Sequence, residues 1–261
     1  METRLEATGQ AGFYSGTSGI MLPVKNKQFF PPEFADKSRL TYYATFFNSI
    51  EINSSFYKIP MASTVAKWAD QVPVNFRFTF KLWRGITHNK GLIFEAADVE
   101  RFMHTIDEVG AKKGCLLVQF PPGLKINMAS QLEKLFVEIT GTDTEREWNI
   151  ALEFRNDSWY DDSIFDLCDR YNAGIVAHDK RTAASSFLDL AADFKYLRFH
   201  GPGGDYKGDY SDDFLYDNAL LASEWTQEGK QVYAYFNNTV GGAVKNLNTL
   251  NSSYAEIVAA E

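Results

Sequence analysis

Hydrophobic and polar positions form two alternating patterns along this chain. Eight short runs are apolar or aromatic and rich in β-forming residues, at about 12–20, 49–57, 75–82, 115–120, 149–155, 174–179, 194–200 and 231–237. Between them lie segments with helical spacing, at about 37–47, 61–70, 95–109, 128–140, 162–172, 212–229 and 242–258. Strands that alternate with helices in this order predict βαβ units and a parallel sheet.

Eight such strands favour an α/β fold with a closed parallel (β/α)8 TIM-like barrel, formed by residues 1–261 as a single domain. We expect residues 1–11 to be a loose N-terminal tail. The segment from Lys180 to Asp193 has poor periodicity, so helix 6 is expected to be short or irregular. An open doubly wound sheet is the alternative, although no Gly-x-Gly-x-x-Gly motif follows the first strand.

Polar residues gather where the predicted strands end. Side chains two residues apart share one face of a strand, and the outward face of a helix-covered barrel must be apolar. This rule turns three pairs inward: Glu51 with Asn53, Glu153 with Arg155, and Arg198 with His200. Further inward candidates are Lys81, Gln119, Asn237 and Asp179, the last at the end of a poorly defined strand. Catalytic groups of such barrels lie at the strand carboxyl ends, which predicts a polar pocket there.

These residue types suggest acid–base chemistry on an anionic molecule. Glu153 and His200 are the leading proton-transfer candidates, because imidazole titrates near neutrality and burial can raise a carboxylate pKa towards it. Lys81 is an alternative, as an amine nucleophile that forms a Schiff base. Asp179 completes the catalytic candidates. The expected substrate-binding residues are Glu51, Asn53, Gln119, Arg155, Arg198, Tyr210, Asn237, Gly203 and Gly241.

The expected substrate is a small anionic or phosphorylated polyol-like molecule. Arginine and lysine side chains can clamp its carboxylate or phosphate. Gly203 and Gly241 lie in glycine-rich turns after the last two predicted strands, the usual phosphate-binding position of this fold. Ordinary turn chemistry explains those glycines equally well. For the inward charges, a purely structural network is the alternative, but a functional pocket is favoured.

Two other functions remain open. Glu51, Glu153, Asp179 and His200 offer ligands for a divalent metal, as in a sugar isomerase or an endonuclease-IV-like phosphodiesterase. The interleaved Arg and Lys residues would repel a cation, so no cofactor is predicted. The other alternative is a non-enzymatic nucleotide or nucleic-acid binding module.

Composition narrows the class of protein. The chain of 261 residues is 45% hydrophobic, enough for a large core, and its net charge of −8 disfavours binding to nucleic acid or acidic membranes. Cys115 and Cys168 have no metal-binding or redox spacing, so we expect both to be buried thiols in a cytoplasmic protein. We expect neither export nor membrane spanning, because residues 1–10 carry no apolar signal and no long apolar run occurs.

A series of nine motifs resembles one known family. The motifs are Gly16-Thr17-Ser18-Gly19, Glu51-Ile52-Asn53-Ser54-Ser55-Phe56-Tyr57 with Pro60, Phe78-Thr79-Phe80-Lys81, Ile86-Thr87-His88, Gln119-Phe120-Pro121-Pro122, Glu153-Phe154-Arg155 with Ser158-Trp159, Arg198-Phe199-His200-Gly201, Tyr206-Lys207-Gly208-Asp209-Tyr210-Ser211 and Tyr235-Phe236-Asn237-Asn238. Their order over Gly12 to Leu250 is similar to that of the "domain of unknown function 72" family. The resemblance implies a TIM-like barrel and no particular reaction. One departure is Ile20, which stands where the family pattern has Trp.

Overall fold

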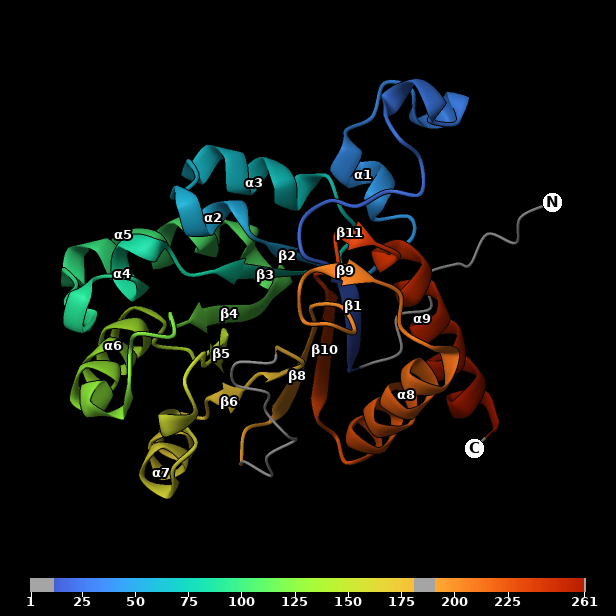
Figure 1. The fold of residues 1–261 in the computed structure, drawn as a ribbon. Coiled ribbons are helices and arrows are strands. Elements are labelled where there is room, and N and C mark those ends of the chain that lie inside the picture. Colours follow the sequence, from blue (N-terminus) through green and yellow to red (C-terminus); the bar gives the residue numbers. More distant parts are fainter. Residues whose placement is uncertain (1–11, 181–190, 261) are drawn as a thin grey trace.

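The computed structural model describes residues 12–180 and 191–260 (Figure 1). Its strands are β1 Phe13–Thr17, β2 Ser49–Ile52, β3 Arg77–Lys81, β4 Lys113–Gln119, β5 Asn149–Glu153, β6 Gly174–Ile175, β7 Ala177–His178, β8 Phe194–Phe199, β9 Lys207–Gly208, β10 Gln231–Phe236 and β11 Val240–Gly241. Its α-helices are α1 Arg39–Tyr43, α2 Ser54–Tyr57, α3 Ala62–Asp70, α4 Arg84–Thr87, α5 Ala96–Ile106, α6 Ala129–Thr142, α7 Asp162–Arg170, α8 Asp212–Gln227 and α9 Ala243–Ala260. Each predicted run overlaps an observed element of the same type.

Local sequence features explain where the helices begin and which faces they bury. In α8, the Ser211 hydroxyl accepts the backbone N–H of Phe214 at 3.3 Å, and two aspartates occupy the first turn, where the helix dipole favours negative charge. In α5, one face buries Val99, Phe102 and Ile106 against the sheet side of the molecule. Helices α8 and α9 pack side by side (Figure 1).

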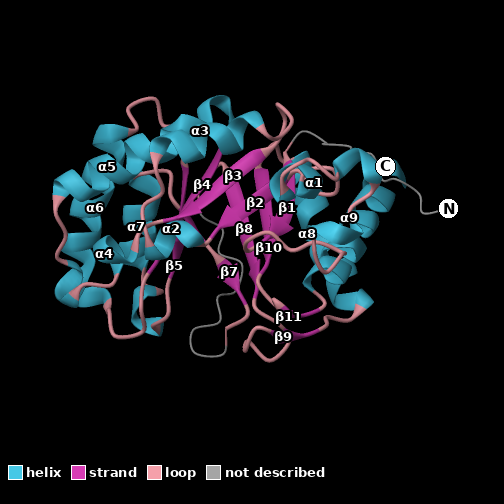
Figure 2. Cartoon of the chain, turned by 90° about the horizontal axis from the view of Figure 1, so that it is seen from above, coloured by secondary structure: helices cyan, strands magenta, loops and turns pink. Residues whose placement is uncertain are grey.

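The main strands form two parallel sheets. One has the order β2-β3-β4-β5-β6 and the other the order β1-β10-β8-β7, while β9 and β11 form a short third sheet. Figure 2 shows the strands in the middle of the molecule and the helices around them. The alternating α/β fold with parallel strands is therefore confirmed, whereas closure into one continuous (β/α)8 sheet is not.

The two main sheets nevertheless meet at both edges. On one side, the segment 174–178 changes partner midway: β6 pairs with β5, and β7 pairs with β8. On the other side, β1 and β2 share only an isolated bridge between Ser18 and Glu51.

Side chains replace the missing ladder between β1 and β2. The backbone N–H of Ser15 donates to Asn48 Oδ1 at 2.9 Å, and that of Thr17 donates to the Tyr43 hydroxyl at 2.8 Å. Gly16 also lies so close to β2 that a Cβ there would come within 2.1 Å of the Ser49 carbonyl oxygen. Because these donors are already satisfied, β1 does not form a regular ladder with β2.

The strands bury two different faces. Ile50, Leu152 and Phe199 point outward into the large apolar core under the helices. A separate inner cluster contains Cys115, Leu117, Ala151, Val176, Ala192, Phe194, Tyr196, Tyr233 and Tyr235. The predicted alternation, with apolar residues outward and the polar set inward, is confirmed by this division.

The remaining expectations concern the N-terminal tail, helix 6, the two cysteines and membrane spanning. The predicted loose tail at 1–11 lies outside the described residues, as does most of the segment expected to hold a short or irregular helix 6. Cys115 and Cys168 are buried free thiols, as predicted. No helix in the described part of the chain combines the length and apolar character needed to cross a bilayer.

Candidate functional site

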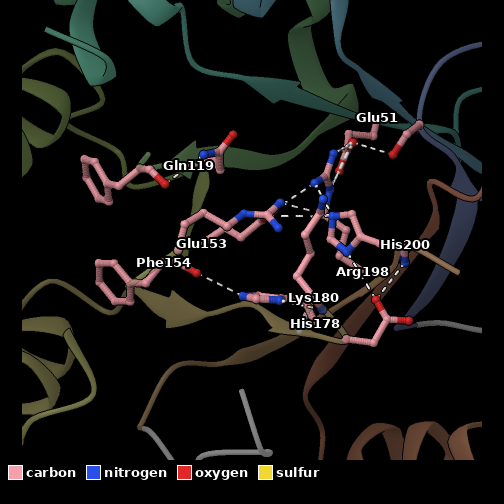
Figure 3. Close-up of polar contacts among 12 residues, drawn as sticks. Glu51, Gln119, Glu153, Phe154, His178, Lys180, Arg198 and His200 are labelled. Carbon is pink, nitrogen blue, oxygen red and sulfur yellow. Dashed lines mark hydrogen bonds and ion pairs between the residues drawn. The ribbon is translucent and has the colours of Figure 1, made fainter. Parts of the chain in front are cut away.

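Arg198, on β8, lies at the centre of a buried polar network (Figure 3). Its Nη2 donates to Glu51 Oε1 at 2.7 Å, and its Nε donates to Glu51 Oε2 at 2.9 Å. Its Nη1 donates to Glu153 Oε2 at 3.0 Å. One guanidinium from β8 therefore joins carboxylates from β2 and β5, with only 2% of Arg198 exposed.

Glu51 has hydrogen-bond donors on both of its oxygens. Besides Arg198, the Ser18 hydroxyl donates to Oε1 and the Tyr196 hydroxyl donates to Oε2, each at 2.5 Å. Burial alone would raise the pKa of Glu51, but the charge and hydrogen bonds of Arg198 outweigh it, and the pKa falls below its usual value. The ionised form of Glu51 is thus favoured, and both of its oxygens accept hydrogen bonds.

Glu153 is also held as an anion. It contacts Arg198 on Oε2 and forms an ion pair through Oε1 with Arg155, although that second contact lacks the alignment of a hydrogen bond. Burial raises the pKa of Glu153, yet Arg198 and Arg155 lower it by more, so the net shift is well downward. This direction is opposite to the raised pKa expected for a carboxylic acid that donates protons near neutrality.

His200 follows β8 and is fixed as a neutral ring. Its Nε2 lies 2.8 Å from Arg198 Nη1 and 3.2 Å from Arg155 Nη2. A guanidinium only donates, so Nε2 accepts and the ring proton is on Nδ1, which faces Asp179 Oδ1 at 3.2 Å. Burial is the main cause that lowers the pKa of His200 to about 4; Asp179 opposes it, and Arg198 adds to it.

Asp179, in the loop after β7, forms hydrogen bonds with residues of the loop after β8. Its Oδ1 accepts the backbone N–H of His200 at 2.8 Å, and its Oδ2 accepts the hydroxyl of Tyr210. The Tyr210 oxygen in turn accepts the N–H of Gly201 at 2.6 Å. Tyr210, a predicted substrate contact, is buried in this arrangement and holds the loop.

Lys81, at the end of β3, differs from the other charged members. No side chain or carbonyl within the described part of the chain forms a hydrogen bond or ion pair with its Nζ, which lies 4.1 Å from the centre of the Phe56 ring. Burial, followed by the charge of Arg198, lowers the pKa of Lys81 to about 8, against the opposing charges of Glu153 and Glu51. The amine therefore exists in both protonation states near neutral pH.

Two further polar atoms of the predicted set are buried without a hydrogen-bond partner among the described residues. They are Nη1 of Arg155 and Oδ1 of Asn53. Ile52 lies opposite Phe80 in the β2–β3 register, so the next inward positions, Asn53 and Lys81, are neighbours. Unsatisfied buried groups are uncommon in folded proteins. Of these two residues, Asn53 lies beside the unpaired lysine, and the charge of Arg155 lowers the pKa of that lysine.

The remaining candidates stand apart from the network. Gln119, at the end of β4, donates from Nε2 to the carbonyl of the adjacent Phe120 at 2.8 Å. Asn237 follows β10, and its backbone N–H donates to Phe199 at 2.7 Å. Gly203 lies in the turn after β8, where Gly204 closes back on Gly201.

The glycine-rich turns pack against each other. Gly241 of β11 pairs with Gly208 of β9, and a Cβ at Gly241 would lie 2.4 Å from the Gly208 carbonyl oxygen. At the start of α9, the Asp209 carboxylate lies directly against Gly242. These contacts explain the glycines by close packing, and they put a negative charge where the sequence predicted a seat for an anion.

The alternative metal-binding set does not assemble as a set of ligands. Within residues 12–180 and 191–260, no group of three or more His, Cys, Asp or Glu residues is arranged to hold a metal ion. Arg198 separates Glu51 from Glu153, and its positive charge occupies the position a cation would need.

Sequence reasoning missed two members of the network. Tyr196 and Ser18 both donate to Glu51, but neither was among the predicted site residues. Tyr196 precedes Arg198 by two residues on the same strand face, so the rule that identified Arg198 also applied to Tyr196. Ser18 belongs to the motif Gly16-Thr17-Ser18-Gly19 at the end of the first predicted strand, which was the available signal for it.

Comparisons with known proteins agree with this fold. A family model described as "Protein of unknown function DUF72" matches residues 14–259. The chain is 26% identical over 254 residues to the UPF0759 protein YunF of Bacillus subtilis (strain 168), covering 82% of this chain and 85% of that protein.

Solved structures show the same architecture. A DUF72 family protein from Enterococcus faecalis V583 superposes with a TM-score of 0.73 at 22% identity, covering 93% of this chain and 95% of that one. A DUF72 family protein from Thermotoga maritima MSB8 gives 0.66 at 20% identity, covering 92% and 98%. At these identities the structures support the fold alone, and it is the match of the family model over nearly the whole chain that makes this protein a member of the DUF72 family.

Proposed function

We propose that this protein is an enzyme that binds a small anionic, polyol-like molecule at the carboxyl ends of its central strands. One observation carries the proposal: Arg155 Nη1 is buried without an acceptor among the described residues, and its charge acts on Lys81, which has no ion pair within them. Leaving a buried charged donor unsatisfied costs free energy. A carboxylate or phosphate bound at Arg155 would remove that cost.

The distribution of charge supports the same position. Glu51 is paired with Arg198, Glu153 contacts both arginines, and Asp179 accepts from His200 and the Tyr210 hydroxyl. Lys81 is then the member of the set whose charge has no direct counterion among the described residues. An anion between Lys81 and Arg155 would compensate it.

We assign proton transfer to Lys81 rather than to Glu153 or His200. A catalytic acid or base works best when its pKa lies near the working pH, and that of Lys81 is about 8. Glu153 and His200 would instead hold the two arginines in position. Asn53 would accept a hydrogen bond from a substrate hydroxyl, and Gln119 is proposed to orient the substrate from the neighbouring strand.

This function requires an enclosed pocket, and we propose that the two sheets together act as a (β/α)8 barrel. The shared segment 174–178 and the Ser18–Glu51 bridge support that view. In such a barrel the inward residues of both sheets face one interior, and the contacts of Arg198 with Glu51 and Glu153 across the sheets support that view.

Calorimetric titration with glycerol 3-phosphate and with glycerol tests the anion site. The wild-type protein is expected to bind the phosphate ester and not glycerol, and Arg155→Met should weaken binding by about tenfold or more, since hydrogen bonds to charged groups contribute about 1.5–3 kcal/mol. Arg101→Met is the matched control, because Arg101 is exposed, forms an ion pair with Asp98 on α5 and lies over the Trp83 ring, outside the network of Arg198. Equal affinity of wild type and Arg155→Met would overturn the proposal.

A further inference from the structure

We propose that Lys81 is a carbonyl-reacting amine, whose Nζ forms an imine with a small aldehyde or ketone that carries a carboxylate or phosphate held by Arg155. The inference rests on the proposed function, because it uses the same pocket. It adds a covalent step and a substrate class, namely anionic carbonyl compounds.

The position of Lys81 suits a nucleophile. Phe78 and Phe80 turn outward into the core beneath the helices, so Lys81 at the end of the same strand is held at the rim. The Ser55 hydroxyl donates to the Lys81 carbonyl at 2.7 Å and fixes the strand end, while the Phe56 ring lies against the amine. The backbone is thus anchored, and the Nζ is left without a hydrogen-bond partner among the described residues.

The surroundings of Lys81 favour the neutral amine. Glu51 and Glu153, whose charges act on Lys81, are already engaged by arginines. Burial and Arg198 lower the pKa of Lys81 to about 8, and Arg155 acts in the same direction. At neutral pH roughly a tenth of the molecules then carry a nucleophilic amine, compared with well under a thousandth for an ordinary lysine.

The proposed step balances without an oxidant or reductant. The Nζ lone pair forms a bond to the carbonyl carbon, and the C=O π electrons move to oxygen. A proton passes from nitrogen to that oxygen, giving a carbinolamine. Loss of the oxygen as water then forms the C=N bond, so that amine and carbonyl become imine and one water.

The distance between the two cations limits the size of the substrate. Strand β4 lies between β3, which carries Lys81, and β5, which leads to Arg155. Neighbouring strands are about 4.8 Å apart, so these two backbones are roughly 10 Å apart. With side chains reaching into that gap, a compound with only a few carbon atoms between its carbonyl and anionic group fits.

Another lysine provides an internal control. The pKa of Lys112 is also lowered by burial, but its Nζ donates to the carbonyls of Ala69 and Val72 at 2.5 and 2.8 Å. Lys67, on the exposed side of α3, reports on unspecific reaction. If a lowered pKa were sufficient, Lys112 would react like Lys81; if an unoccupied amine beside Arg155 is needed, it would not.

The test is trapping with borohydride. The full chain is incubated at neutral pH with pyruvate, dihydroxyacetone phosphate or acetone, reduced, digested and analysed by peptide mass spectrometry. We expect an adduct at Lys81 with pyruvate, with dihydroxyacetone phosphate or with both, and little adduct with acetone. Labelling of Lys81 should exceed that of Lys67 and Lys112 by about tenfold or more. The comparison of pyruvate with dihydroxyacetone phosphate distinguishes a carboxylate from a phosphate substrate. Arg155→Met should reduce labelling by the anionic compounds.

Several outcomes would overturn the inference. Labelling of Lys81 no greater than that of Lys67 in all three arms would exclude a carbonyl-reacting amine, while Arg155-dependent binding of glycerol 3-phosphate would leave the proposed function standing. Strong labelling that Arg155→Met does not change would exclude Arg155 as the anion holder. Lys81→Met and Lys81→Gln, each checked for folding by circular dichroism, must both lose the adduct.

Discussion

The polar interior has two layers, and they differ in how completely their charges are paired. In the deeper layer, Glu51, Glu153 and Arg198 bond mainly to each other, and Glu51 has donors on both oxygens. Glu153 Oε1 has no hydrogen bond among the described residues, but its charge is paired with that of Arg155. In the outer layer, Asn53 and Arg155 each keep a buried atom without a partner. The outer residues follow the deeper ones by two positions on the same strand face, about 7 Å nearer the rim.

This difference separates two uses of a buried charge. A charge with a full set of partners needs nothing else, so it can serve the fold. A charge or amide with an unused donor or acceptor is stabilised further when a ligand arrives. Depth along the strand thus distinguishes the part of the network that supports the pocket from the part proposed to bind substrate.

The largest expected effect comes from breaking the deeper layer. Arg198→Met leaves Glu51 and Glu153 buried beside each other without their shared cation, and the free energy of unfolding should fall by about 3–5 kcal/mol. Urea denaturation measures this loss. Arg170→Met is the control, since Arg170 pairs with Glu133 on the surface and its loss should cost less than about 1 kcal/mol. Similar losses in the two variants would mean that Arg198 does not hold the network together.

A smaller effect concerns His200, which connects the layers. Its pKa is about 4 in the folded chain and 6.5 for an unperturbed imidazole, so between these values the unfolded chain binds the extra proton. This group therefore makes the free energy of unfolding rise with pH across that window. Nitrogen-15 NMR of the imidazole should show the proton on Nδ1 and a neutral ring from pH 8 to about pH 5. A midpoint near 6.5, or a proton on Nε2, would contradict the arrangement.

Much of the inward set could be predicted from the sequence, because alternation along a strand is a local property. Glu51, Glu153 and Arg198 were placed correctly in this way, and Tyr196 could have been. Which residue pairs with which could not be predicted, since it depends on strand register and on side-chain reach between sheets. The lowered pKa of Glu153 follows from its pairing with the two arginines. Because that pairing could not be predicted, the sequence suggested a raised pKa and an acid–base role for Glu153.

Closure into one continuous (β/α)8 sheet is not confirmed, and the cause is of the same kind. The side chains of Asn48 and Tyr43 take backbone donors of β1 that a regular ladder would use, and both lie about 30 residues away in the chain. Likewise, the packing of Gly241 against Gly208 and of Gly242 against Asp209 could not be predicted, because these partners lie in another turn, far away in the chain.

The pH titration of the Lys81 side chain is the most direct test of the difference between the layers. The carbon-13 signal of its Cε, assigned by its absence in Lys81→Arg, should titrate with a midpoint of about 8 and move to higher pH when glycerol 3-phosphate is added. Arg155→Met should abolish the response to the ligand. A midpoint near the ordinary 10.5, unchanged by the anion, would contradict the account.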